Sequence, residues 1–467
     1  MVPEDILSLS ATRLLALYKS KAISPVEVTR TVLAQIAKLN PSINAFCVVD
    51  PERAMQLAHE SEQRWHSGSP VGALDGIPTS VKDLVLAKGW PTRRGSLTID
   101  PDQAWEDDGP PVARMREQGA IIMGKTTTPE FGWKGVTDSA LTGITRNPWN
   151  HAMTPGGSSG GAAAAAALGM GPLHLATDGG GSIRIPAAFC GVFGFKSSWG
   201  LVPVHPHSPA LTLWHQGPIT RTVEDAALLQ SVIARPDARD WYQLPENSID
   251  YVSQLNQGVK GWRIAYSPDL GYADVDPRIA TAIEKQLQVF RDLGAQVEII
   301  DLKLDDPISI MRPLWAVALA LAIEPMSAEK RALVEPAMLE LAQPGFELSA
   351  LDYRKLEKER EALGRRLNNL TETYDLLITP QMPITAFEAG YEVPPGGSRK
   401  RWWEWSPFTY PFNLSQQPTA TVPCGFINGL PIAMQLVGSK FSDAKVLQAA
   451  RAYEAVHPFV MPASHSI

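Results

Sequence analysis

The chain has 467 residues, and its 42 Lys and Arg against 49 Asp and Glu give a formal net charge of -7. No block of Lys and Arg stands out, and this argues against a nucleic-acid-binding protein, which normally shows a basic stripe or patch. Charged residues are only 19% and apolar residues 44%, so the chain can bury a large core and general disorder is excluded.

The first half of the chain predicts helices interrupted by short apolar strands. The first 45 residues are expected to be helical, with Ser24 as the cap of a helix that begins at Pro25. Further along, residues 120–123 predict a buried strand, residues 162–168 a closely packed alanine helix, and residues 192–195 a second buried strand.

The second half predicts a βαβ unit and further strands. Residues 236–260 are polar and weakly patterned, which indicates a long connection. The remaining elements are strands at 263–266, 296–300, 376–379 and 430–437, a helix at about 277–293, and a charged, solvated helix at 351–370. Strands of the βαβ unit are expected to be parallel and buried on both faces. Together these elements predict an α/β fold with a large mixed, mostly parallel central sheet sandwiched by helices.

The cysteines, the histidines and the N-terminus bear on location and cofactors. Cys47, Cys190 and Cys424 are far apart in the sequence and form no C-x-x-C motif, which favours a reducing compartment over disulfides or a zinc ribbon. The nine histidines show no metal-ligand spacing. The N-terminus is acidic, unlike a signal peptide, and the apolar stretches are too short to span a bilayer. We therefore expect a cytoplasmic protein with no metal and no membrane partner.

Two clusters of glycine and serine, at residues 154–161 and 178–184, are the strongest chemical signal in the chain. Glycine lets the backbone approach a ligand closely, and successive N–H groups before a serine can stabilise developing negative charge. Neither cluster contains the P-loop pattern G-x-x-x-x-G-K-[ST] or the dinucleotide pattern G-x-G-x-x-G. The clusters therefore favour a nucleophilic serine over a nucleotide site.

The residues alone leave the nucleophile and its base open. Residues 157–161 formally match G-x-S-x-G, which would make Ser159 the nucleophile of a hydrolase elbow, but turn formers precede them where that elbow needs a strand. No histidine has a distinctive context. Lys82 lies in an apolar stretch, where desolvation could lower its pKa enough for it to act as a base, although a surface position is the alternative. Lys125, after an apolar strand, is equally ambiguous.

In combination, these segments resemble the amidase signature hydrolases. The resemblance rests on residues 76–78 leading to Lys82, on the two Gly/Ser clusters, and on residues 217–225 and 431–438. It covers most of the chain and implies a single domain over residues 1–467. Within it, residues 76–235 would form the signature core, and residues of about 240–400 the variable segment that shapes the substrate pocket.

The resemblance implies a Ser–Ser–Lys triad. Ser182 would be the nucleophile, Ser158 a bridging hydroxyl in a cis peptide with Gly157, and Lys82 the general base. The remaining implied roles are an oxyanion hole from the backbone N–H groups of Gly179, Gly180, Gly181 and Ser182, an auxiliary hydroxyl from Ser159, and a structural ion pair between Asp178 and Arg184. The implied reaction is hydrolysis of a linear aryl or aliphatic amide, with anilides, carbamates and esters compatible and no cofactor needed.

Two departures from the family pattern concern its specificity. Ile185 stands where the tRNA-dependent amidotransferase subunits of the family usually have glutamine, which argues against that role. Residues 415–418 read Ser-Gln-Gln-Pro where Thr-Gly-Gln-Pro is more usual, a change that could reshape the pocket near Asn413. The alternatives that remain are an amidotransferase-type subunit or a catalytically silent binding relative.

Aromatic side chains predict the substrate pocket. The candidates are Phe131, Trp133, Trp315, Trp403 and Trp405. Aromatic walls suit an apolar or aryl amide, although the same rings could fill a core or a dimer contact. We expect a small-molecule amide as the partner, no nucleic acid, and a monomer or homodimer.

Overall fold

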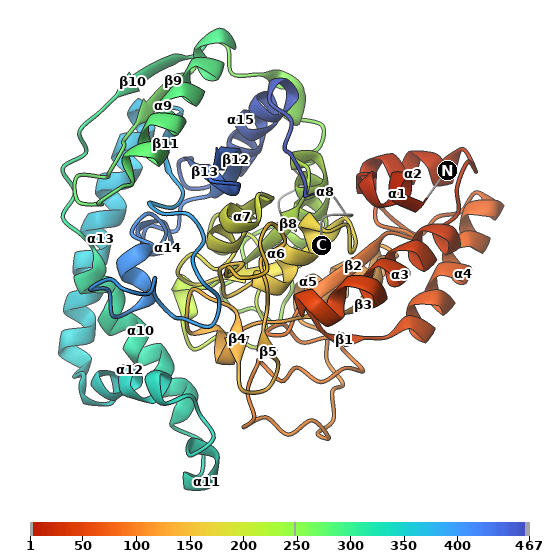
Figure 1. Cartoon of the computed structure of the whole chain (residues 1–467), viewed down its shortest axis with the longest axis horizontal. Helices are drawn as coiled ribbons and strands as arrows, with labels where there is room; N and C mark the ends of the chain where they lie inside the picture. The colour runs from red at the N-terminus through yellow and green to blue at the C-terminus, as the bar shows by residue number, and fades with distance from the viewer. Residues whose placement is uncertain (1–2, 247–248, 463–467) are drawn as a thin grey trace.

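A central sheet of eleven strands organises the structure, a computed structural model that describes residues 3–246 and 249–462 (Figure 1). In spatial order its strands are β1 (Phe46–Val49), β3 (Ile121–Thr126), β2 (Pro78–Lys82), β6 (Leu173–Asp178), β8 (His215–Thr220), β7 (Phe193–Lys196), β12 (Thr419–Ile427), β13 (Leu430–Val437), β11 (Leu376–Pro380), β9 (Arg263–Tyr266) and β10 (Gln296–Ile299). A short hairpin, β4 (Asp138–Ser139) with β5 (Gly143–Ile144), stands apart.

The sheet is mixed, as expected, but its parallel pairing is confined to two blocks. The strands β3, β2 and β6 form one parallel block, and β11, β9 and β10 form the other. Between the blocks, β8, β7, β12 and β13 run antiparallel to their neighbours. Antiparallel pairings outnumber parallel ones six to four among the described strands of this sheet, so the expected excess of parallel strands is corrected to a mixed arrangement.

Helices surround this sheet. They are α1 (Pro3–Ser8), α2 (Ala11–Lys19), α3 (Pro25–Ile43), α4 (Pro51–Ser67), α5 (Pro110–Glu117), α6 (Gly160–Ala167), α7 (Arg184–Cys190), α8 (Val223–Ile233), α9 (Pro277–Asp292), α10 (Ile308–Ile323), α11 (Ala328–Arg331), α12 (Pro336–Glu347), α13 (Ala350–Thr373), α14 (Pro411–Leu414) and α15 (Asp443–Val456). The predicted start of α3 is confirmed, because Ser24 and Glu27 cap it reciprocally. In Figure 1, α1–α4 lie at one end of the molecule and α10–α13 at the other.

Residues of β6 show that the sheet has a hydrophobic layer on each face. Leu173 and Leu175 belong to a large cluster that includes α3, α8, α9 and α15. Ala176 points to the opposite face and belongs to a cluster formed by α6 and α7. Successive side chains of a strand alternate between faces, so the two clusters lie on opposite sides of the sheet. This agrees with the predicted sandwich.

Two details differ from the sequence expectations. The strand β10 is not buried on both faces: it is the last strand of the sheet, and its Ile299 is 57% exposed. The helix α13 is mostly solvated, but its Arg360 is buried and donates to the Leu414 carbonyl oxygen at 2.8 Å. Burial at these positions depends on which element lies next to them in space.

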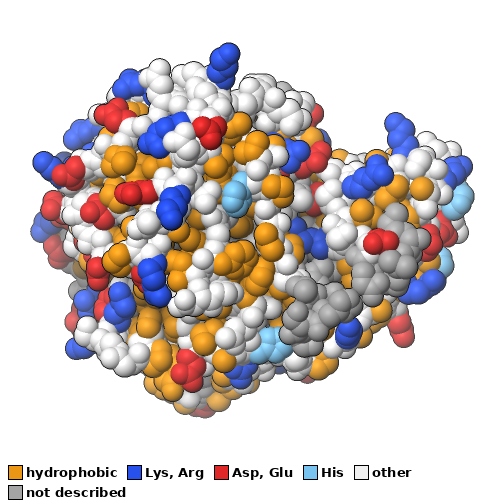
Figure 2. Space-filling model, turned by 45° about the horizontal axis from the view of Figure 1, so that its top comes forward, with side chains coloured by type: hydrophobic (Ala, Val, Ile, Leu, Met, Phe, Trp, Pro, Cys, Tyr) orange, Lys and Arg blue, Asp and Glu red, His pale blue; other side chains and the backbone are white. Residues whose placement is uncertain are grey.

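The surface carries both signs of charge side by side. On the face seen in Figure 2, acidic and basic side chains are interspersed among apolar ones, and no large area is of one sign. Within residues 3–246 and 249–462, no helix combines the length and the apolar character that crossing a membrane requires.

Candidate active site

Sheet topology brings the lysine and the second Gly/Ser cluster together. The strand β2 ends at Lys82, and the neighbouring parallel strand β6 ends at Asp178. The carboxyl ends of parallel neighbours lie at the same edge of a sheet, where α/β proteins place their ligand sites. Residues 179–182 follow β6 directly, so Ser182 lies at the same edge of the sheet as Lys82.

The side chain of Lys82 is buried and surrounded by hydroxyl groups. Its Nζ lies 2.7 Å from Ser158 Oγ, 2.9 Å from Ser159 Oγ and 2.9 Å from Thr177 Oγ1. Burial lowers the pKa of Lys82 well below 10.5, and the charge of Asp178 opposes this only in part. A neutral amine is therefore accessible at this position.

Thr177 was not among the residues anticipated from the sequence. It precedes Asp178 at the end of β6, and its hydroxyl completes the set of three around the lysine. The available signal was its place one residue before the second Gly/Ser cluster.

Ser158 and Ser159 come directly before the first residue of α6. The residue before them, Gly157, has no room for a side chain. The peptide bond between Gly157 and Ser158 is cis, as the resemblance implies. A Cβ atom on Gly157 would lie 2.4 Å from the carbonyl oxygen of Val136, closer than any real contact. Only glycine fits there, and Ser158 is thereby held against Lys82.

Ser182 is held beside the first cluster through the backbone. The Ser159 N–H donates to the Ser182 carbonyl oxygen at 3.1 Å. Ser182 is 8% exposed, against 1% for Ser158 and none for Lys82, so it is the most open member of the three. In the described part of the chain no hydrogen bond joins the hydroxyls of Ser158 and Ser182 directly.

Asp178 organises the loop that carries Ser182. Its carboxylate accepts from the Gly181 N–H at 2.8 Å and from the Ile183 N–H at 3.1 Å. The Gly181 N–H is therefore already engaged, which removes it from the donors expected for the oxyanion hole. Among the described residues, the N–H groups of Gly179, Gly180 and Ser182 have no hydrogen-bond partner.

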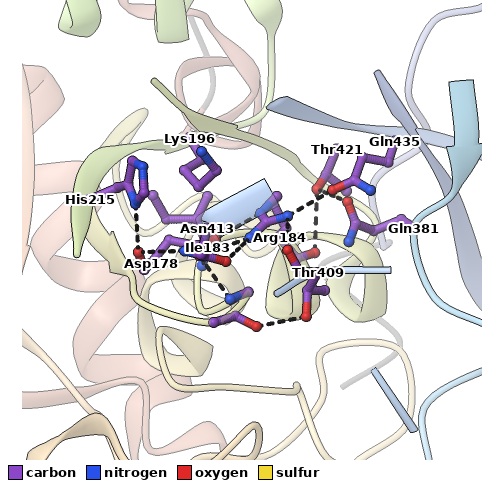
Figure 3. A network of polar contacts seen from close by, with 12 residues as sticks. Asp178, Ile183, Arg184, Lys196, His215, Gln381, Thr409, Asn413, Thr421 and Gln435 are labelled. Atoms are coloured by element: carbon purple, nitrogen blue, oxygen red, sulfur yellow. Dashed lines mark hydrogen bonds and ion pairs between the residues drawn. The ribbon is translucent and has the colours of Figure 1, made fainter. Parts of the chain in front are cut away.

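Arg184 ties this loop to distant parts of the chain (Figure 3). Its Nε donates to Asp178 at 2.9 Å, which places the expected ion pair entirely in the interior. It also donates to the Thr409 carbonyl oxygen, Gln435 Oε1 and Asn413 Oδ1 at 2.6–2.8 Å. Burial would raise the pKa of Asp178, but the guanidinium outweighs that effect and holds the pKa well below its usual value. The carboxylate thus stays charged and keeps the loop in place.

A cavity of about 120 Å³ with largely apolar walls adjoins the loop. Phe131 and Trp315, both anticipated, line it, and so does Trp214, which was not. A Cβ atom on Gly179 would lie 3.1 Å from the Trp315 ring, so this wall touches the Ser182 loop. None of the triad residues and none of residues 179–182 lines the cavity itself, so its link to the loop is the contact of the Trp315 ring with Gly179.

The other anticipated aromatic residues do not line this cavity. Trp133 and Trp405 are fully buried in a core cluster, where their indole N–H groups donate to the Glu335 carboxylate and the Glu392 carbonyl oxygen. Trp403 lines a separate cavity of about 800 Å³ on another side of Trp315. Trp133 and Trp405 therefore belong to the core and line neither cavity, because their partners come from distant helices and loops, while Trp403 remains a wall residue of the second cavity.

The described residues contain no group of three or more His, Cys, Asp or Glu side chains arranged to hold a metal ion.

Comparison with known proteins shows the family of the chain. The sequence matches the amidase family model over residues 27–447. It is 34% identical to an acylamidase of Rhodococcus erythropolis, with 98% of each chain covered. It is also 33% identical to one of the subunits of the glutamyl-tRNA(Gln) amidotransferase of Symbiobacterium thermophilum, with 96% of each chain covered. Among solved structures, a bacterial aryl acylamidase of the amidase signature enzymes has a TM-score of 0.90, with 32% identity and 96% of each chain covered.

Proposed function

Because the chain belongs to the amidase signature family, we propose that it hydrolyses linear amides through an acyl-enzyme formed on Ser182. The protein is a hydrolase of carbon–nitrogen bonds, like the acylamidases that it resembles. The roles of individual residues and the aryl character of the substrate are the proposal. The observation that carries it is a buried Lys82 whose hydrogen-bond partners are hydroxyl groups and not a carboxylate.

The hydrogen bonds around Lys82 support its role as the base. The Ser159 hydroxyl donates to the Thr177 carbonyl oxygen at 3.1 Å, so toward Lys82 it can only accept. A neutral amine has two N–H donors and one lone pair, and three hydroxyl neighbours satisfy it if one of them donates. Ser158, the nearest at 2.7 Å, is the hydroxyl whose proton we assign to that lone pair.

The nucleophilic step follows from this arrangement. Lys82 takes the proton of Ser158, Ser158 takes that of Ser182, and Ser182 Oγ attacks the amide carbonyl carbon. This relay requires the Ser158 and Ser182 hydroxyls to come into contact when substrate binds. The N–H groups of Gly179, Gly180 and Ser182 are the unpaired donors available to the tetrahedral oxyanion, and losing one such donor typically costs about 3–4 kcal/mol of barrier.

The same groups complete the reaction. The relay returns a proton to the leaving nitrogen, the C–N bond breaks, and the amine departs. Water then attacks the acyl-enzyme, giving up its proton through the same chain, and releases the carboxylic acid. Asp178, held charged by Arg184, keeps the loop in position throughout both steps.

The cavity beside the site supports an aryl or other apolar amide. Phe131, Trp214 and Trp315 offer flat faces to a ring, and two acylamidases are among the relatives, one of them an aryl acylamidase. Anilides are the substrates we propose first. Carbamates and esters have carbonyl groups that the same triad can attack, and we propose them as side activities.

A fluorophosphonate serine probe followed by peptide mass spectrometry tests the nucleophile. The wild type should carry one adduct on Ser182, which the Ser159→Ala variant keeps and the Ser182→Ala variant loses. An adduct on Ser159 instead would overturn the assignment and restore the hydrolase-elbow interpretation.

The amidotransferase alternative needs a separate test, because a protein of that kind is among the relatives. The purified chain should release aniline from acyl anilides without any partner protein or tRNA. A chain that turns over glutamine only, and only with further subunits present, would favour the alternative.

A further inference from the structure

Arg94 is a half-buried cation that lacks a partner. Its guanidinium makes no hydrogen bond and no ion pair within the described residues, although it lines the cavity beside the active site. Two other arginines with little exposure are paired, the half-buried Arg64 with Asp75 at 2.6 Å and the buried Arg184 with Asp178, whereas the Nε of the neighbouring Arg93 also lacks a partner. Removing a cation from water without a counter-charge costs free energy, and an anion bound in the cavity would offset that cost.

Asp83, the carboxylate whose charge acts on Arg94, is already committed to other groups. Asp83 forms an ion pair with Lys125 at 3.1 Å and accepts from the N–H groups of Arg93 and Gly95. These bonds hold the chain on both sides of Arg94, whose own φ of 55° lies in the left-handed region. Burial lowers the pKa of Arg94 and the charge of Asp83 opposes this, yet no direct contact forms between them. The loop thus fixes the backbone around Arg94, whose guanidinium forms no ion pair in the described structure, although it also lines a second cavity together with Glu106 and Asp107.

Backbone contacts connect Arg94 to the catalytic groups. The Phe131 N–H donates to the Arg94 carbonyl oxygen at 2.7 Å. The next residue, Gly132, is so close to the triad that a Cβ atom there would lie 3.1 Å from Ser158 Oγ. One wall of the cavity therefore runs from Arg94 through Phe131 toward Ser158.

A further lining residue of the cavity also lies close to the catalytic groups. Trp315 lines the cavity and lies against Gly179, at the start of the loop that carries Ser182. A substrate with its carbonyl group at Ser182 and its side group in this cavity would extend toward the guanidinium. His207 also lines the cavity, but its Nε2 is already bonded to Asp240 at 2.9 Å.

We propose that Arg94 binds a carboxylate on the amide substrate, so that the enzyme prefers amides bearing an anionic group over neutral ones of the same shape. The inference rests on the proposed function, since it places the substrate carbonyl at Ser182. A guanidinium can donate two parallel hydrogen bonds to a carboxylate, and an apolar surrounding strengthens such a pair. The carboxylate can belong to the acyl part or to the amine part of the substrate.

Binding to the Ser182→Ala variant tests the proposal without any turnover. Two matched pairs of probes are titrated calorimetrically, each comparing a carboxylate with a neutral nitro group of similar shape. For the amine part the pair is para-acetamidobenzoate and para-nitroacetanilide. For the acyl part it is succinanilate and the anilide of γ-nitrobutyric acid.

In at least one pair the carboxylate should bind more tightly than the nitro compound. Adding Arg94→Met should reduce that preference about 10- to 100-fold, the usual value of a charged hydrogen-bonded contact, and Arg94→Lys should keep part of it. Arg93→Met, which removes the neighbouring positive charge from the same loop, should leave the preference in place.

The proposal is overturned if neither pair shows a carboxylate preference, or if the preference survives Arg94→Met. Failure of the proposed function has a different signature. The wild type would then release no para-nitroaniline from para-nitroacetanilide and no amine from other neutral amides, whatever the binding data show.

Discussion

Two buried lysines on neighbouring strands have opposite surroundings. Lys82 ends β2, and Lys125 lies on β3, whose parallel register places it opposite Val81. Both side chains are fully buried. Lys125 forms an ion pair with Asp83 at 3.1 Å and donates to the Val85 carbonyl oxygen at 3.0 Å. Lys82 meets hydroxyl groups only.

The comparison shows that burial alone does not make a lysine a base. Burial lowers the pKa of both side chains, but at Lys125 the adjacent carboxylate of Asp83 opposes the shift directly. The carboxylate that acts on Lys82 is Asp178, which is already paired with Arg184. Of these two lysines, Lys82 therefore gives up its proton more readily, and Lys125 serves structure.

The largest expected effect is on turnover. Lys82→Met should lower kcat by about a thousand-fold or more, since a positioned base contributes about 10²–10⁴-fold and activates the nucleophile as well. Steady-state hydrolysis of an anilide measures this, with circular dichroism to verify folding. Retention of kcat within tenfold of the wild type would exclude Lys82 as the base.

Lys125→Met should affect stability, because it leaves the Asp83 carboxylate buried and unpaired. We expect the free energy of unfolding to fall by about 3–5 kcal/mol, the usual cost of removing one partner of a buried ion pair. Denaturant unfolding measures it, and adding Asp83→Asn should recover part of the loss. If Lys82→Met were destabilising by the same amount, the contrast between the two sites would be wrong.

The pH dependence of activity follows from the lowered pKa of Lys82. Below that pKa the amine is protonated and cannot accept the proton of Ser158, so log kcat/KM should rise by one unit per pH unit and then level off. The bend should fall well below 10.5, the ordinary pKa of lysine. A rate still rising with unit slope through that value would show that the lysine is not depressed.

The smallest effect concerns Thr177. Its hydroxyl accepts a hydrogen bond from Lys82 and thereby favours the ammonium form. Thr177→Val should lower the pKa of Lys82 further and move the bend of the pH profile down by about half a unit to one unit. A shift to higher pH would mean that Thr177 donates to the neutral amine instead.

The triad residues could be anticipated because their segments carry the resemblance to the amidase signature hydrolases, whereas the residues alone left the nucleophile and its base open. Ser158 and Ser182 stand in Gly/Ser clusters, and Lys82 follows a turn and a short strand. By contrast, nothing local distinguishes Trp315, which lines the cavity, from Trp405, which is buried in the core. From the sequence, both are tryptophans with no distinguishing motif around them, so their roles depend on the neighbours that folding provides.

The sequence by itself determined the α/β class and part of the order of helices and strands, since these follow from periodicity. The family and the triad residues that meet at the edge of β2 and β6 came from the resemblance that its short motifs carry. The strands β1, β6, β8 and β12 were not predicted. Only the tertiary structure decided that Gly181 serves Asp178 and that Arg184 reaches Thr409 and Gln435. Such contacts join residues more than two hundred positions apart or use backbone groups, and neither kind of contact produces a recognisable pattern in the amino-acid sequence. Whether a buried charge has a partner depends on which residues the fold brings together. In the low dielectric of the interior, gaining or losing one such partner changes the free energy of the folded state considerably.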